Sequence, residues 1–126
     1  MRKKLKEYSF ISPDPNLQRN VMSFGFEVGD GWMDLLEELF DKMQKIIDND
    51  SQCNAIEVVQ VKEKFGELRV YTNYDTDEIF NLIEEYTRKS KHICEWCGKK
   101  GKLRNDNGWY TTLCNKCHEK RLESMQ

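Results

Sequence analysis

Apolar residues recur at helical spacing in two stretches of this chain, and a β-branched, alternating segment lies between them. In the first stretch the apolar positions follow at steps of three and four, with mostly acidic residues on the opposite side. They are Trp32, Leu35, Leu36, Leu39, Phe40, Met43, Ile46 and Ile47. We predict a helix over about 31–48, with Asp30 as its N-cap. So wide an apolar stripe indicates a core-facing surface rather than a cofactor pocket.

The segment 55–73 predicts an antiparallel hairpin. Its first half is rich in β-branched residues and its second half alternates between apolar and polar positions. Between them, Lys62–Glu67 is polar and contains a glycine, which is typical of a turn. We expect Val70 to face the core beside Val59 or Val61.

A second helix is expected over about 76–90. Asp75, followed three residues later by Glu78, fits a capping box. Basic residues stand at the other end, where the helix dipole favours cations. The apolar stripe of this helix consists of Ile79, Phe80, Leu82, Ile83 and Tyr86.

The first 28 residues give weaker signals. Residues 1–20 have little periodicity and contain a Pro- and Asn-rich turn at 12–16, so we expect an irregular leader. Residues 21–28 fit a short extended segment that begins an α+β body over 21–90. One face of this segment would carry Met22, Phe24, Phe26 and Val28.

Four cysteines in the C-terminal third form two pairs, Cys94 with Cys97 and Cys114 with Cys117. Two residues separate the thiols of each pair, and the sequence between the pairs has the length of a two-knuckle zinc site. Four thiolates complete the tetrahedral shell of Zn²⁺ and leave no position for water, so the expected cofactor is structural zinc. Disulfides are the alternative, but they require an oxidising compartment that nothing in the chain indicates.

The module over 91–126 has a recognisable order of elements. Short strands over 102–104 and 109–113 flank an Asn- and Gly-containing turn, and a helix is expected from 115 to about 124. Knuckle, hairpin and helix are the order of a treble clef, and a zinc ribbon is the second choice. We expect the module to dock rigidly on the body, and the residues expected to make the contact are Ile93, Trp96, Leu103 and Trp109.

Two further residues bear on the cysteine chemistry. Cys53 has no partner in either pair and is expected to be a small buried or loop residue. His118 directly follows Cys117 and could replace it as a ligand, but with four thiols available a surface position is favoured.

No apolar run reaches the roughly 20 residues of a membrane helix, and no signal core follows the basic start, so a cytoplasmic location is expected.

Charge divides the chain into two parts. Residues 1–87 carry a net charge of −8 and residues 88–126 a net charge of +6, within a total of −2. The basic part suggests a nucleic-acid or partner patch, or lysines that balance an anionic zinc–thiolate centre. That patch comprises Arg88, Lys89, Lys91, Lys99, Lys100, Lys102 and Arg104. An acidic partner face on the first helix comprises Asp34, Glu37, Glu38 and Asp41, although acidic outer faces are usually just solvated.

Three sequence blocks resemble a family of small uncharacterised bacterial and phage proteins. They are Gly25–Trp32, Val61–Arg69 and the first cysteine pair with its glycine, Cys94–Gly98, together with Leu113 and Cys114. Members carry cysteine where this chain has Val28, which suggests packing rather than ligation at that position. The resemblance implies a phage or prophage setting and brings no activity with it.

The residues favour binding over catalysis. A zinc hydrolase or deaminase needs an open coordination position and a general base, whereas only two histidines occur and neither lies between the cysteine pairs. We expect a non-catalytic zinc protein that binds and modulates or inhibits a host bacterial protein, with a defence component as one version. The alternative is a nucleic-acid-binding zinc finger that uses the patch around 88–104.

Overall fold

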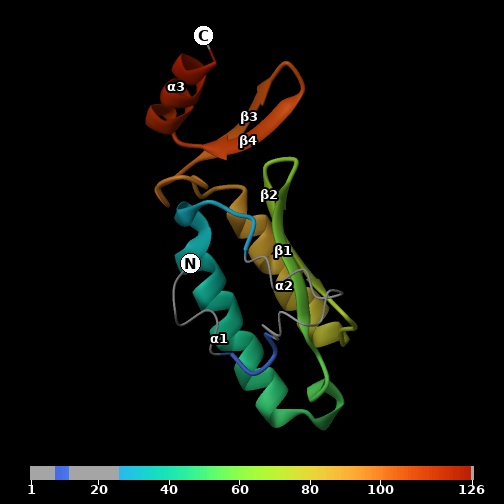
Figure 1. Ribbon diagram of the computed structural model, residues 1–126. Coiled ribbons are helices and arrows are strands. Elements are labelled where there is room, and N and C mark those ends of the chain that lie inside the picture. The colour runs from blue at the N-terminus through green and yellow to red at the C-terminus, as the bar shows by residue number, and fades with distance from the viewer. Residues whose placement is uncertain (1–7, 12–25, 126) are drawn as a thin grey trace.

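The computed structural model describes residues 8–11 and 26–125, and the positions expected for Met22 and Phe24 lie outside them. Its helices and two small antiparallel sheets confirm the α+β class (Figure 1). The elements, with η for a 3-10 helix, are η3 Asp30–Trp32, α1 Met33–Asn49, η4 Ser51–Cys53, β1 Val58–Lys64, β2 Glu67–Thr72, α2 Asp77–Ser90, β3 Lys102–Asp106, β4 Trp109–Leu113 and α3 Asn115–Ser124.

The first helix begins differently from the sequence prediction. Asp30 makes no side-chain capping bond and instead opens the 3-10 turn η3 ahead of α1. The amides of Trp32 and Met33 donate to the backbone carbonyls of Gly29 and Asp30, so they are not available to a capping carboxylate. The prediction of Asp30 as N-cap is therefore wrong, while the apolar stripe of α1 is buried as expected.

The hairpin of β1 and β2 turns more tightly than its sequence suggested. Lys64 pairs with Glu67, which leaves only Phe65 and Gly66 in the turn, with φ of 54° and 83°. Two successive positive φ values are those of a type I′ turn, whose twist suits a hairpin. The expected polar turn over 62–67 is thus mostly strand. Val70 is buried and pairs with Val61, as predicted.

Part of the N-terminal leader belongs to the core. Tyr8, Phe10 and Ile11 are buried against α1, and the Tyr8 hydroxyl donates to Asp41 Oδ1 at 2.5 Å. Ile11 also forms a parallel bridge beside β1. A short apolar cluster without periodicity gave no sign of this packing, because its partners lie about 30 residues away along the chain.

Helix α2 packs beside α1 and against β2, and its buried residues belong to the same core. Its N-cap is Thr76, whose hydroxyl accepts from the amide of Ile79 at 3.4 Å, so the capping role predicted for Asp75 is wrong. Ile79 and Tyr86 are fully buried, whereas Phe80 is 50% exposed and does not belong to the core stripe. One residue step on a helix turns a side chain through about 100°, which is enough to carry Phe80 out of the core.

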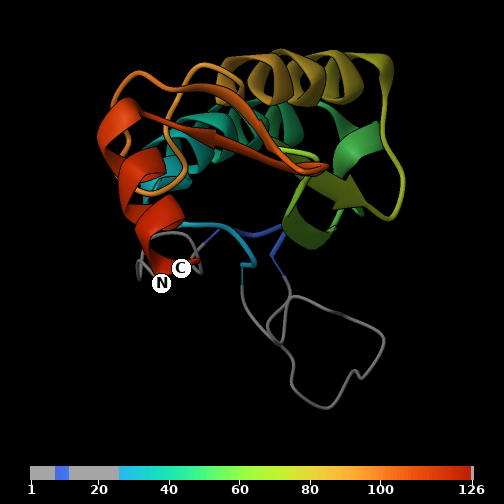
Figure 2. The ribbon, with the colours of Figure 1, turned by 90° about the horizontal axis from the view of Figure 1, so that it is seen from above.

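The cysteine-rich module lies at one end of the body, beyond the turn of the β1–β2 hairpin (Figures 1 and 2). Hydrogen bonds to backbone groups dock it. The indole of Trp32 donates to the carbonyl of Ile93 at 2.8 Å, and the hydroxyl of Thr112 donates to the carbonyl of Gly66. Of the four residues expected to make the contact, Ile93 packs against the core of the body, and Leu103 lies beside Gly66 although it is 53% exposed. Trp96 and Trp109 are 44% and 67% exposed.

Candidate metal centre

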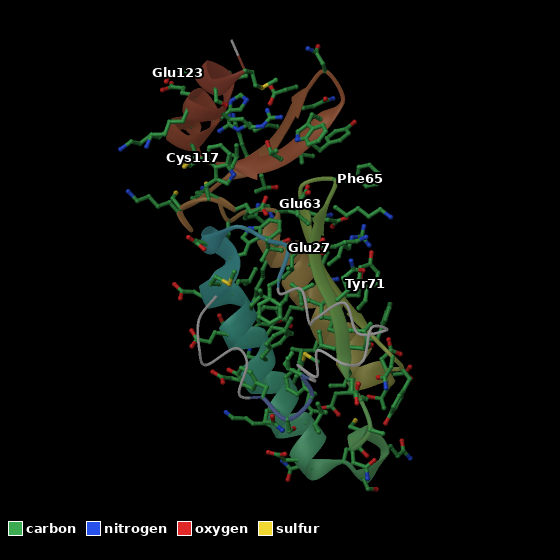
Figure 3. The ribbon with its side chains drawn as sticks, in the orientation of Figure 1. Glu27, Glu63, Phe65, Tyr71, Cys117 and Glu123 are labelled. Atoms are coloured by element: carbon green, nitrogen blue, oxygen red, sulfur yellow. The ribbon has the colours of Figure 1, made fainter. Side chains whose placement is uncertain are left out.

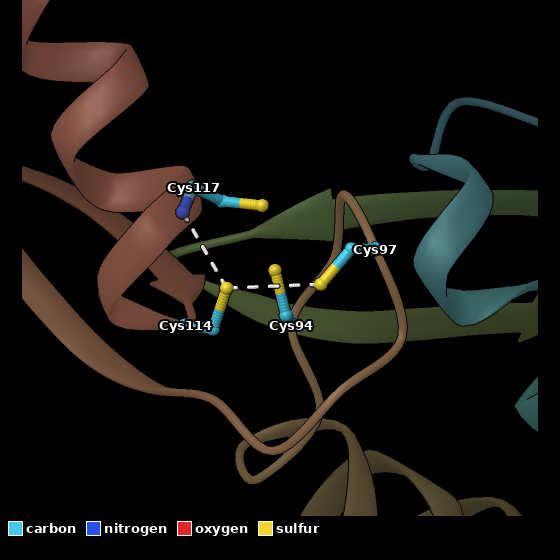
Figure 4. A group of neighbouring side chains, drawn as sticks. All are labelled: Cys94, Cys97, Cys114 and Cys117. Atoms are coloured by element: carbon cyan, nitrogen blue, oxygen red, sulfur yellow. Dashed lines mark hydrogen bonds between the residues drawn. The ribbon is translucent and has the colours of Figure 1, made fainter.

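The four predicted cysteines meet at one point between the module's first loop and its final helix (Figure 4). Their sulfur atoms all lie within 4.8 Å of one another, and the sulfurs of Cys97 and Cys114 are 3.7 Å apart. All four are free thiols, as is Cys53, which is buried elsewhere, in η4. The cluster therefore unites a loop with the start of α3, and 16 residues separate Cys97 from Cys114 in the sequence.

The first pair is shaped by a tight backbone loop. The carbonyl of Cys94 accepts from the amide of Gly98 at 2.9 Å, and the amide of Cys94 donates to the carbonyl of Lys99 at 2.7 Å. Gly98 has a φ of 84°, which a residue with a side chain adopts only at a cost. These bonds turn both sulfurs of the pair toward the same side of the loop.

The second pair is placed by the start of α3. Cys114 is the N-cap of this helix, and its sulfur accepts from the amide of Cys117 at 3.4 Å. The carbonyl of Cys114 accepts from the amide of His118 at 2.9 Å. Capping by a thiol places Cys117 in the first turn, on the same side as Cys114. A helix rather than a strand begins within the second pair, which is the order expected for a treble clef.

The surroundings of the thiols set their protonation. The amide of Cys117 stabilises a thiolate at Cys114 and lowers its pKa to about 6. Burial raises the pKa of the Cys117 thiol to about 12, since desolvation favours the neutral form. One sulfur of the second pair is therefore ready to bind a cation, and the other must lose a proton to do so.

The donor set fits a tetrahedral metal ion. Zinc–sulfur bonds of about 2.3 Å imply sulfur atoms about 3.8 Å apart around one ion, which is close to the 3.7 Å between Cys97 and Cys114. Cys94 is fully buried and Cys97 is exposed, so the cluster has one wall of protein and one edge at the surface. Four thiolates could hold a soft or borderline metal ion without a further ligand.

The predicted basic patch is divided among several neighbourhoods. Lys89 approaches Glu85 at 3.3 Å, and Lys91 approaches Glu67 at 3.5 Å. The guanidinium of Arg104 is turned inward, where it donates to the carbonyl of Leu113 and to Asn115 Oδ1. Four members remain exposed and have no ion pair within the described residues: Arg88, Lys99, Lys100 and Lys102. Three of these lie on or beside the first cysteine loop.

The predicted acidic face of α1 is also partly engaged. Glu38 accepts from the Tyr86 hydroxyl at 3.0 Å and lies near Lys42 and Lys89. Asp41 binds the Tyr8 hydroxyl. Asp34, Glu37 and Asp41 each have a further interaction. None of these carboxylates is without a partner, so together they do not form a face of free charge.

A polar cluster that the sequence did not predict ties the module's hairpin to its helix. Asp106 lies 3.2 Å from His118 Nε2, and Arg121 donates to the same carboxylate at 2.7 Å. All three side chains are largely buried. His118 is therefore not a member of the thiol cluster, and it is more enclosed than a surface residue. The spacing of His118 and Arg121, one helical turn apart, was the available signal.

The second feature missed from the sequence is an apolar groove where body and module meet, which we call the junction groove. It has a volume of about 420 Å³ and is lined by Phe65, Gly66, Glu67, Lys91, Leu103 and Tyr110. Phe65 is 66% exposed, and its ring meets Tyr110 edge-on at a centroid distance of 6.2 Å. Figure 3 shows Phe65 at the tip of the β1–β2 hairpin, beneath the hairpin of the module. An aromatic residue just before the glycine of a hairpin turn was its one sequence signal.

Comparisons with protein-family models, with curated proteins and with solved structures gave no match to this chain. Within residues 8–11 and 26–125, no helix is both long enough and apolar enough to cross a membrane. The structure thus shows an α+β chain with a four-cysteine cluster that could bind a metal ion.

Proposed function

We propose that this chain is a non-catalytic protein-binding module whose binding surface is held in place by a structural zinc ion. The observation that carries the proposal is the junction groove, because one of its walls belongs to the body and the other to the cysteine module. In line with the sequence resemblance, we place the protein in a phage or prophage and its partner in the cytoplasm of the bacterial host. A component of a defence system is the concrete version of that partner.

The chemistry of the four-cysteine cluster supports a structural ion. Four thiols fill the coordination sphere of zinc, and a structural zinc site commonly supplies folding free energy to a small domain. His118, the nearest histidine, is held by Asp106 and Arg121. The metal would thus fix the hairpin of the module in place above the turn of the body.

The exposure of Phe65 supports a role in binding. A bulky residue with positive φ is uncommon and costs free energy, and such strain gathers at functional sites. The chain nevertheless places this ring at the surface, next to exposed Leu103 and half-buried Tyr110. Aromatic side chains that are exposed in the free protein and gathered at a groove are the usual anchors of protein interfaces.

The test is affinity capture of a bacterial protein by the zinc-loaded chain and by two variants. Phe65→Asn removes the ring at the turn but suits a positive φ, so the hairpin is retained. Met125→Ser changes an exposed apolar residue at the far end of α3 and serves as the matched control. A captured protein is then purified, and its affinity for each variant is measured directly.

We expect the partner to bind the wild type and Met125→Ser equally and Phe65→Asn at least about tenfold more weakly, as for a typical interface anchor. A chelator that removes zinc should abolish binding, since one wall of the groove is lost. Capture of no protein by the wild type, or binding that neither Phe65→Asn nor the chelator weakens, contradicts the proposal.

Nucleic-acid binding is the second candidate, and one observation favours it. Three exposed lysines have no ion pair in the described part of the chain: Lys99, Lys100 and Lys102. Trp96, which is close to them in the sequence, is also exposed. Cations beside an aromatic ring are what single-stranded nucleic acid binds. Retention on an oligonucleotide that falls steeply with salt, and that Lys99→Glu removes, would support this function instead.

A further inference from the structure

The two long edges of the β1–β2 hairpin differ in how they are covered. Along the edge of β1, the amide of Val58 donates to the carbonyl of Phe10 at 2.9 Å. Farther along, the amide of Glu27 donates to the carbonyl of Val61 at 3.0 Å, and the carbonyl of Glu27 accepts from the amide of Glu63 at 3.3 Å. The edge of β2 has no neighbouring strand in the part of the chain that the structure describes. Among the described residues, β2 is therefore the last strand of this sheet.

Three residues of β2 direct their backbone groups out of this edge. The carbonyl of Val61 accepts its hydrogen bond from Glu27, on the side away from β2. Val70 pairs directly with Val61, so it likewise turns its amide and carbonyl away from β1. Leu68 and Thr72, two residues to either side, point the same way. The amide of Leu68 indeed donates outward, to Ser90 Oγ at 2.9 Å, which closes that end of the edge. The stretch from Val70 to Thr72 has no such cover within the described residues.

This open stretch borders a groove that we call the edge groove, with a volume of about 230 Å³. Strand β2 forms one wall, and one stripe of α2 forms the other, at the helical spacing of 80, 83, 84 and 87. Phe80 belongs to this stripe, which accounts for a half-exposed aromatic ring on a helix whose neighbouring apolar residues are buried. A strand edge facing a helix across a groove is the arrangement to which extended peptides add as a further strand.

The free charge along the edge groove is negative. Asp75 and Glu84 line it, and neither has an ion pair within residues 8–11 and 26–125. Arg69, the one cation among the described residues that line the groove, is bound by Glu67 at 2.6 Å. A ligand that carries a cation matches the two carboxylates.

We propose that the edge groove binds an extended, basic segment of a partner protein, which adds to β2 as a third strand. The segment exchanges backbone hydrogen bonds with Val70 and Thr72, packs an apolar side chain on Phe80, and sets a Lys or Arg beside Asp75 and Glu84. This inference rests on the proposed function in so far as both require a protein ligand, but it names a different surface from the junction groove.

The test begins with selection of binders from a displayed library of random twelve-residue peptides against the zinc-loaded full chain. Selected peptides are synthesised with blocked ends, and their binding is followed through the backbone amide signals of the protein by NMR. We expect the selected sequences to be rich in Lys or Arg and in β-branched residues. The amides of Val70 and Thr72 should shift most. N-methylation of alternate peptide amides should weaken binding at least about tenfold, because it removes donors to the strand.

Variants of the protein sharpen the test. Thr72→Pro removes an outward amide without breaking the ladder to β1, as proline at a strand edge allows, and Thr72→Val keeps that amide as the matched control. We expect about tenfold weaker binding for Thr72→Pro and for Glu84→Lys, and a change below about twofold for Thr72→Val. Equal binding to all of these variants overturns the inference. Should Thr72→Pro fail to fold, the N-methylated peptides answer the same question, and their undiminished binding overturns it as well.

The remaining outcomes separate this inference from the proposed function. The selected peptides could instead shift the signals of Leu103 and Tyr110, and Phe65→Asn could weaken their binding. The protein ligand then lies in the junction groove, so the edge inference fails and the proposed function stands. Recovery of no peptide also overturns the edge inference, while capture through the junction groove decides the proposed function independently. A dimer of the wild type that Thr72→Pro dissociates shows that a second copy of the chain occupies β2, and this too overturns it.

Discussion

The backbone amide of Gly31 donates a hydrogen bond to the carbonyl oxygen of Glu95 across 2.7 Å. This bond joins the start of the first helix to the first cysteine loop. It requires a close approach of two backbones, because a Cβ on Gly31 would lie 2.1 Å from the carbonyl oxygen of Cys94. The amide of Gly29 adds a bond to the Glu95 carboxylate at 3.0 Å. The body and the cysteine-rich module are thus held together by close contacts to the main chain, which leave no space for a side chain at position 31.

Gly31→Ala should destabilise the folded chain by about 1–3 kcal/mol, because the new methyl group meets backbone atoms that cannot move aside easily. The measurement is chemical denaturation of the zinc-loaded protein. Asp30→Ala is the neighbouring control and should cost less than about 0.5 kcal/mol, since its side chain caps nothing. A larger loss for Asp30→Ala than for Gly31→Ala would contradict this account of the junction.

Thr76→Ala should destabilise the chain by about 1 kcal/mol, the usual cost of losing an N-cap hydroxyl. Asp75→Ala should have a smaller effect, because Asp75 stands one position too early to cap α2. Thermal or chemical unfolding of the two variants gives the comparison. The reverse order of stabilities would restore Asp75 as the cap.

Phe65→Asn should leave the free energy of unfolding within about 1 kcal/mol of the wild type. The change relieves the strain of a bulky residue at φ 54° and loses the edge-on contact with Tyr110, and these effects oppose each other. Denaturation curves of the two proteins provide the measurement. A much larger loss would mean that the ring mainly holds the module on the body, and its exposure would then need a structural explanation.

Acidification should release the metal. The pKa of the Cys117 thiol is raised to about 12 by burial, so the ion displaces a proton from it at neutral pH. Below about pH 6 the metal-free cluster also protonates Cys114, whose pKa the Cys117 amide lowers to about 6. The apparent metal affinity should therefore fall as pH falls, and fall more steeply below that value. Competition with a chromophoric chelator from pH 8 to pH 5 measures it, and an affinity independent of pH would oppose this interpretation.

The helices and the four-cysteine cluster were predictable because their signals are local. The apolar stripe of α1 needs only 3.6-residue periodicity, and the two cysteine pairs need only their spacing. The expected span of α3 agrees with the observed Asn115–Ser124 for a similar reason, since its start is fixed by the second pair.

The parts that were not predictable depend on contacts between distant residues. The docking of the module rests on bonds such as that between Trp32 and Ile93, 61 residues apart, and backbone partners leave no mark on composition. The aromatic residues expected to dock the module, Trp96 and Trp109, are exposed instead. The burial of Phe10 and the exposure of Phe80 likewise follow from tertiary packing, which overrides apolar character.

Cys94→Ser should abolish metal binding and unfold the C-terminal module, because Cys94 is the fully buried ligand of the cluster. Cys53→Ser is the matched control, as Cys53 is also a buried thiol but lies outside the cluster. This control should keep one metal ion per chain even where it loses some stability. Metal content by mass spectrometry and loss of module signals in NMR make the comparison.

We propose that four sulfur atoms close the coordination sphere of a zinc ion and leave no place for solvent. X-ray absorption at the zinc edge of the purified, metal-loaded protein tests this most directly. We expect a first shell of four sulfur atoms at about 2.3 Å and no lighter ligand. A shell of three sulfur atoms with one oxygen or nitrogen would contradict the closed site, and with it the non-catalytic role that we propose.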